Sequence, residues 1–189
     1  MISWIIFFVG AIFSFVFSVG VNAGIMSVGQ ILLIFVVALI IICLVNGITA
    51  TICCKCLPNK LFNKDNRFYS TGRKEFNFYN KINIKSWKDK TLEWGELNGF
   101  SKDKIEKPKD PDYINRFILE CNKGFLGHLV SLFVAGIIFL VVPKIFVLPM
   151  ALPMFITSFV LNCIPIMILR YNVYRLKTVL KFIERHNQK

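Results

Sequence analysis

The chain has 189 residues, of which 55% are hydrophobic and 18% charged, and its formal net charge is +12 at neutral pH. Residues 1–54 contain no Lys, Arg, Asp or Glu. A water-facing surface of that size would carry charged side chains, so the composition excludes a wholly soluble protein. Acidic residues are interleaved with the basic ones and no nucleic-acid-binding module is present, which argues against a nucleic-acid partner.

Four apolar segments are long enough to cross a bilayer, whose hydrocarbon core of about 30 Å needs about 20 helical residues. We predict these segments at 2–21, 30–54, 125–142 and 148–169. The alternative is that one of the last two is re-entrant. Prolines interrupt the fourth segment. A membrane helix tolerates such prolines because neighbouring helices can satisfy the backbone carbonyls that they leave without a donor. We expect the helix of this segment to end near Arg170.

The first segment has no positive charge before it and exceeds the usual length of a signal-peptide core. We therefore expect a retained helix rather than a cleaved signal peptide.

Basic residues are concentrated in two regions. Residues 55–123 hold sixteen Lys and Arg against ten Asp and Glu, residues 170–189 hold six against one, and Lys144 is the remaining basic residue. The positive-inside rule places both regions in the cytoplasm. The expected fold of residues 1–189 is therefore a single all-α membrane domain of about four transmembrane helices. A cytoplasmic interfacial segment at 55–124 separates helices two and three, the tail at 170–189 is cytoplasmic, and both termini lie inside.

The segment at 55–124 combines many aromatic residues with Lys and Asn. That mixture suits the headgroup layer of a membrane, so we predict interfacial helices and turns folded onto the ends of the membrane helices, with anionic headgroups as partners. Within it, Asp110 or Asp112 is expected to cap a helix that runs from Tyr113 into the third span.

Polar residues at membrane depth are the candidates for function. On the predicted third helix Glu120, Gly124 and His128 are spaced by four and share one face, with His128 about 6 Å inside the apolar region. An ionisable group at that depth faces the bundle interior or a wet cavity. His128 is therefore either one side of an interhelical hydrogen bond or a proton acceptor at an interfacial active site. Asn162, on the fourth helix, is a buried polar group suited to binding between helices.

Arginines follow the fourth apolar segment. Arg170 and Arg175 either anchor the helix end in anionic lipid or, together with Asn172, bind a phosphate, carboxylate or sugar hydroxyl. The six cysteines have no spacing typical of a four-ligand zinc site, and we predict neither a metal nor another cofactor.

Four stretches resemble the glycosyl-4,4′-diaponeurosporenoate acyltransferase family of small bacterial membrane proteins. They lie at 57–62 (LPNKLF), 84–104 (IKSWKDKTLEWGELNGFSKDK), 112–128 (DYINRFILECNKGFLGH) and 162–176 (NCIPIMILRYNVYRL). The resemblance implies a bacterial cell-membrane enzyme that moves a fatty acyl group from an activated donor onto a sugar hydroxyl of a glycosylated carotenoid acid or a related glycolipid. Where the family tends to have a second glutamate, three residues before the histidine, this chain has Phe125.

The resemblance and the polar pattern together give a hypothesis for the site. His128 is the general base, and Glu120 orients it or helps to bind the acceptor. The remaining candidates bind substrate: Arg170, Asn172, Arg175, Trp87, Lys88 and Lys102. The arginines would hold donor phosphates or the developing oxyanion, and the lysines would add positive potential. We expect His128, Glu120, Arg170 and Asn172 to line one cavity facing the cytoplasm.

Two alternatives remain open. One is a non-catalytic membrane protein that binds lipid or a partner helix, in which His128 and Arg170 only tie helices together. The other is a different membrane transferase or reductase that acts on a lipid. The sequence leaves the oligomeric state unspecified.

Overall fold

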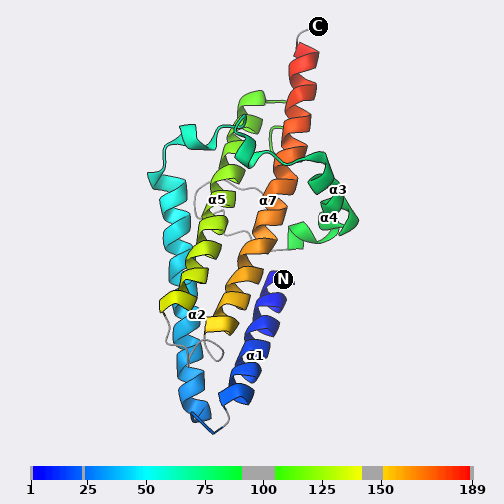
Figure 1. Ribbon diagram of the computed structural model, residues 1–189. Helices are drawn as coiled ribbons and strands as arrows, with labels where there is room; N and C mark the ends of the chain where they lie inside the picture. The colour runs from blue at the N-terminus through cyan, green and yellow to red at the C-terminus, as the bar shows by residue number, and fades with distance from the viewer. Residues whose placement is uncertain (1, 23, 91–104, 142–150, 188–189) are drawn as a thin grey trace.

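The computed structural model describes residues 2–22, 24–90, 105–141 and 151–187, and the regular elements of these ranges are helices. Four long helices form the bundle: α1 (Ile2–Asn22), α2 (Val28–Thr51), α5 (Pro111–Val141) and α7 (Leu152–Asn187). α1 and α5 run in one direction, α2 and α7 run in the other, and the end of α7 projects beyond the bundle (Figure 1). The predicted all-α fold is confirmed.

Within the part of the chain that the structure describes, three stretches of helix are long and apolar enough to cross a membrane. They are Val28–Cys56, Pro111–Ile137 and Phe155–His186, and Gly10–Asn22 is a shorter apolar stretch. The second, third and fourth predicted spans therefore each overlap a helix that fits a bilayer. Residues 142 and 148–150 of the predicted spans lie outside the described residues.

α1 buries small side chains and exposes large ones. Ala11, Ser14 and Ser18 are buried along one stripe, whereas Phe13 and Val16 are exposed. This helix packs mainly on α7, where Ser158 is buried. Small residues allow close approach of helices in a membrane, and large apolar residues outside suit lipid contact.

α2 is attached to α5 by a similar close contact. Thr49 and Ser131 share a hydrogen bond between their hydroxyl groups. One turn away on α5, a Cβ added to Gly127 would lie 3.6 Å from the Cα of Ala50. The space there admits a methyl group at most, so the helices are in direct backbone contact near the level of His128.

α5 begins where the sequence predicts. Asp110 Oδ1 accepts hydrogen bonds from the backbone N–H groups of Asp112 at 2.9 Å and Tyr113 at 3.2 Å. Pro111 occupies the first helical position, where its missing N–H costs nothing. The capped helix then continues without interruption to Val141, which confirms the expected passage from the charged segment into the apolar one.

The prediction that the fourth helix ends near Arg170 is wrong. α7 continues through Pro165 and Arg170 as one helix of 36 residues. Its charged half stays helical because it keeps an apolar stripe: Leu169, Val173 and Leu176 are buried in the same core cluster as residues of α5. Burial of this stripe stabilises the helix where its other side is polar.

The segment between α2 and α5 contains short elements that fold onto the bundle, as predicted. They are the π-turn Ile52–Cys56, the 3-10 turns Asn59–Phe62 and Arg67–Tyr69, the helices α3 (Arg73–Lys81) and α4 (Ile84–Trp87), and the 3-10 turn Lys88–Lys90. Phe62 is fully buried, and its carbonyl accepts a hydrogen bond of 2.9 Å from Asn122 Nδ2 of α5. α3 and α4 lie beside α7 (Figure 1).

Candidate active site

His128 and Asn162 meet at the contact between α5 and α7. Nδ1 of His128 lies 3.0 Å from Oδ1 of Asn162, a residue that is 1% exposed. The two residues are 34 positions apart, and the antiparallel helices bring them to the same level. In the sequence His128 and Asn162 were each a candidate for a hydrogen bond between helices, and the structure pairs them with each other.

The orientation of the Asn162 amide fixes the tautomer of the imidazole. Nδ2 of Asn162 donates to the backbone carbonyl of Ser158 at 2.8 Å and to its hydroxyl at 3.2 Å. Oδ1 therefore faces His128, and an amide oxygen can only accept a hydrogen bond. Nδ1 of His128 is therefore the donor to Oδ1 of Asn162, and in a neutral imidazole with this tautomer the lone pair is on Nε2. A general base requires this arrangement, with one ring nitrogen held by an acceptor and the other able to take a proton.

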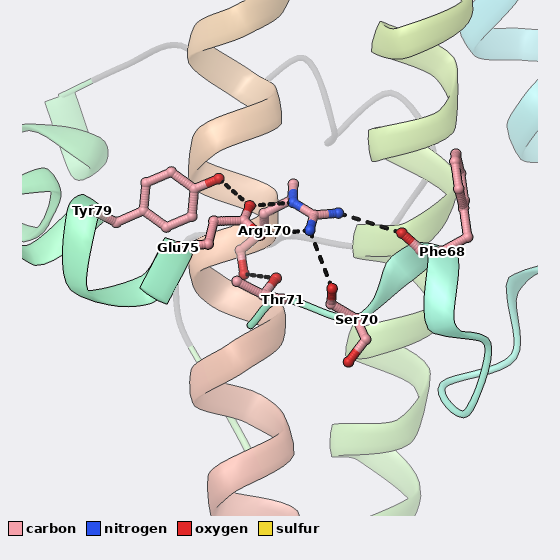
Figure 2. Close-up of polar contacts among 6 residues, drawn as sticks. All are labelled: Phe68, Ser70, Thr71, Glu75, Tyr79 and Arg170. Carbon is pink, nitrogen blue, oxygen red and sulfur yellow. Dashed lines mark hydrogen bonds and ion pairs between the residues drawn. The ribbon is translucent and has the colours of Figure 1, made fainter. Parts of the chain in front are cut away.

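A second polar cluster surrounds Arg170. Its guanidinium donates to both carboxylate oxygens of Glu75, at 2.7 Å from Nη2 to Oε2 and through a short bond from Nε to Oε1. Nη2 also donates to the carbonyl of Ser70 at 3.1 Å, and Nη1 to that of Phe68 at 3.4 Å. Figure 2 shows the guanidinium enclosed between α3 and the segment before it. We call this group the Arg170 clasp.

Two more bonds complete the clasp. The hydroxyl of Tyr79 donates to Glu75 Oε1, and the hydroxyl of Thr71 donates to the backbone carbonyl of Arg170 at 2.9 Å (Figure 2). Phe76 stacks on Tyr174 of α7, with ring centroids 4.1 Å apart. The segment from residue 68 to α3 is therefore fastened to α7 by a bidentate ion pair, backbone hydrogen bonds and stacked rings.

The clasp keeps Glu75 ionised. Burial alone raises the pKa of this carboxyl, but the hydrogen bonds from Arg170 and Tyr79 and the positive charge of Arg170 outweigh burial, so its pKa lies below the ordinary value. Burial, followed by the hydrogen bond to Glu75 and its negative charge, raises the pKa of Tyr79, which therefore stays protonated as a donor.

This shift predicts a pH dependence. Because the folded state holds the pKa of Glu75 below its unfolded value of about 4.5, the clasp contributes its full stability above pH 4.5 and loses it as pH falls through the folded pKa. We expect thermal unfolding in detergent to shift to lower temperature below pH 4.5. The Glu75→Gln variant should lack this part of the shift because its amide does not titrate. If the unfolding temperatures of the two proteins instead fall in parallel as the pH is lowered, other carboxyl groups cause the loss of stability.

Phe125 connects the two clusters. The guanidinium carbon of Arg170 lies 5.0 Å from the centroid of its ring, a cation–π contact. Phe125 is one helical turn from His128 on α5, and Arg170 is eight residues, about 12 Å of helix, from Asn162 on α7. At the position where the family tends to have a glutamate, this chain thus places a ring against Arg170, and Glu75 of α3 supplies the carboxylate.

The other predicted site residues are more dispersed. Glu120 Oε1 accepts from Lys123 Nζ at 2.9 Å, and this ion pair is largely buried. Trp87 is half-buried beside Tyr171, and its Nε1 donates to the carbonyl of Ile82 at 3.2 Å. Lys88 pairs with its neighbour Asp89.

Lys102 lies outside the described residues.

The polar residues of α7 diverge around the helix. At 100° per residue, Arg170 and Asn172 lie about 80° to either side of the direction of Asn162. Asn172 is buried, and Arg175 is exposed with its guanidinium 5.6 Å from the ring of Tyr171. Arg170 and Asn172 therefore point away from each other, and the cavity that we expected them to share with His128 and Glu120 stays a prediction.

Sequence reasoning missed Glu75, Tyr79 and Ser158. One signal was available for Glu75, since it is the only acidic residue between Asp65 and Asp89 in a strongly basic stretch. Among the described residues, no group of three or more His, Cys, Asp or Glu side chains could hold a metal ion.

Comparison with known proteins agrees with the resemblance in the sequence. The profile of the glycosyl-4,4′-diaponeurosporenoate acyltransferase family matches residues 58–182, well over half of the chain. The chain belongs to this family. The match to the acyltransferase family covers α3, α4, α5 and most of α7, and therefore both His128 and the Arg170 clasp. No curated protein and no solved structure gives a significant match.

Proposed function

We propose that the protein transfers a fatty acyl group from an activated donor to a sugar hydroxyl of a glycosylated carotenoid acid or a related glycolipid, at the cytoplasmic face of the bacterial membrane. Family membership supports acyl transfer, and helices long enough to cross a bilayer support a lipid-soluble acceptor. The concentration of basic residues at 55–123 and 170–189 supports the cytoplasmic side for both termini.

The observation that carries the proposal is the hydrogen bond between His128 and Asn162. Nε2 of His128 takes the proton of the acceptor hydroxyl as its oxygen attacks the acyl carbonyl carbon. With an acyl thioester as donor, the new C–O bond forms, the C–S bond breaks, and the proton passes to the departing thiolate. In this proposal Asn162 holds the ring in the tautomer that the step needs.

The basic residues have a separate role in the proposal. Arg170 forms a bidentate ion pair with Glu75. We therefore propose that Arg170 holds α3 against α7 and does not bind donor phosphates. Arg175 is exposed and carries no carboxylate partner among the described residues, so it remains a candidate for the anionic part of the donor, with Asn172, Lys88 and Lys102.

Lipid analysis tests the function. Cells that make a glycosylated carotenoid acid are grown with and without the gene, and their lipids are compared by mass spectrometry. We expect a product heavier than the acceptor by one fatty acyl group and lighter by one hydrogen, only when the gene is present. Identical lipid profiles from cells in which the protein is shown to be inserted would contradict the proposal.

The bond between His128 and Asn162 also fits a second candidate, a non-catalytic membrane protein in which the pair only joins α5 to α7. The two candidates make opposite predictions for substitutions at His128.

A further inference from the structure

α3 has two faces with different chemistry. Glu75, Phe76 and Tyr79 face the bundle and bind α7 through the clasp and the stacked rings. Arg73, Lys74, Phe78 and Lys81 are exposed, and so is Lys85 on α4. Phe78 is 53% exposed, so a large apolar ring stands among these cations. The exposed side of α3 and α4 thus combines four cations with one large apolar ring; we call it the outer basic face.

Among the described residues 66–90, no acid is available to neutralise this face. Glu75 is the only acidic residue from 66 to 88, and its carboxylate is bound by Arg170 and Tyr79. Asp89, the next acid, pairs with Lys88. The one carboxylate of α3 therefore lies on the side that faces α7, and the outer basic face of α3 and α4 carries only positive charge.

The position of α3 along the bundle indicates what surrounds this face. α7 has no charged residue from 152 to 169, and Arg170, its first charge, is the residue that binds α3. On α5, Lys123 is the last charged residue, and Phe125, two positions later, contacts Arg170. α3 is thus attached at the level where the apolar parts of both helices end. In a bilayer that level is the headgroup layer, where phosphates are the abundant anions.

We propose that the outer basic face binds the headgroups of anionic phospholipids. Its lysines and arginine contact lipid phosphates, and the ring of Phe78 enters the boundary between headgroups and acyl chains. Basic residues beside an exposed aromatic ring are the pattern by which short helices bind membrane surfaces. The face would then keep α3, and with it Arg170, at a fixed depth. The proposal is independent of acyl transfer because it concerns only the surface of α3 and α4.

Hydrogen exchange in lipid nanodiscs tests the proposal. The full-length protein is placed in phosphatidylcholine alone and in mixtures with increasing phosphatidylglycerol, and amide exchange is followed for residues 73–85. We expect exchange in this segment to slow as phosphatidylglycerol is added. The double variant Lys74→Gln/Lys81→Gln should weaken the binding constant of the face for the anionic surface about 30-fold, since each basic residue near such a surface contributes about a fivefold gain in binding. Protection of residues 73–85 should then be lost at phosphatidylglycerol fractions that protect the unsubstituted protein.

A matched control removes equal charge elsewhere. Lys181→Gln/Arg185→Gln takes two cations from α7 at least 11 residues, about 16 Å of helix, beyond Arg170. Protection of residues 73–85 should survive in this variant. Equal exchange with and without phosphatidylglycerol would overturn the proposal. If the two variants lose protection of residues 73–85 equally, the effect is one of non-specific charge and the proposal fails. If protection appears only when an acidic soluble protein is added, the face binds a protein partner instead.

Discussion

His128→Ala is expected to abolish acyl transfer while the protein remains inserted and folded. General bases contribute about 10²- to 10⁴-fold to reaction rates, so the product should fall by at least about a hundredfold. The physical reason is that alanine cannot accept the proton of the attacking hydroxyl. The measurement is the formation of acylated acceptor by purified protein, normalised to the amount of folded protein in detergent.

His128→Gln is the matched control for structure. Its amide N–H can donate to Asn162 Oδ1 and so preserve the contact between α5 and α7, but an amide does not accept a proton at neutral pH. Under the enzyme hypothesis both variants are inactive and both stay folded. Under the structural hypothesis alanine lowers the unfolding temperature and glutamine largely restores it. A fully active alanine variant would remove His128 from the mechanism.

Asn162→Ala separates positioning from proton transfer. It leaves Nε2 of His128 in place but removes the acceptor that holds Nδ1. We expect a fall in kcat of about tenfold to a hundredfold, the range typical of losing the hydrogen-bond partner that orients a metal-binding histidine, with little change in the KM of the acyl donor. A KM effect with unchanged kcat would place Asn162 in donor binding.

Helix-capping and burial rules, which need only neighbouring residues, predicted the features of the fold that depend on local sequence. Asp110 followed by proline and an apolar-periodic stretch is a helix start, and the structure caps α5 with that side chain. His128 and Asn162 were each recognisable as polar groups in apolar helices, because such groups are costly unless they find a partner. Their pairing with each other followed only from the antiparallel packing of α5 on α7.

The predictions that were wrong or incomplete concern features that depend on tertiary contacts. Arg170 suggested a helix end because charge begins there, but the buried stripe of Leu169, Val173 and Leu176 continues past it and was present in the sequence. The partner of Arg170 is 95 residues away, and no spacing rule links Glu75 to it. The sequence therefore indicated that Arg170 needs an anion but not that the protein itself supplies one.

Breaking the Arg170 clasp should have the largest effect on stability. Arg170→Ala leaves the carboxylate of Glu75 without its bidentate partner, and it removes the cation–π contact with Phe125 and the donors to Ser70 and Phe68. Removing one partner of a buried ion pair costs about 3–5 kcal/mol. Because the Glu75 side chain is 30% exposed, we expect about 2–4 kcal/mol, measured by thermal or denaturant unfolding in detergent.

Arg175→Ala is the matched control, since it removes the same side chain from the same helix five residues later. Arg175 is exposed, with its guanidinium over the ring of Tyr171 and no carboxylate partner among the described residues, so its loss should cost about 0.5–1 kcal/mol. The double variant Arg170→Met/Glu75→Leu should recover part of the loss, because it leaves neither charge unpaired. If Arg170→Ala and Arg175→Ala destabilise equally, the clasp does not hold α3 to α7. Arg170 would then be available for a substrate anion, which is the role that the sequence first suggested for it.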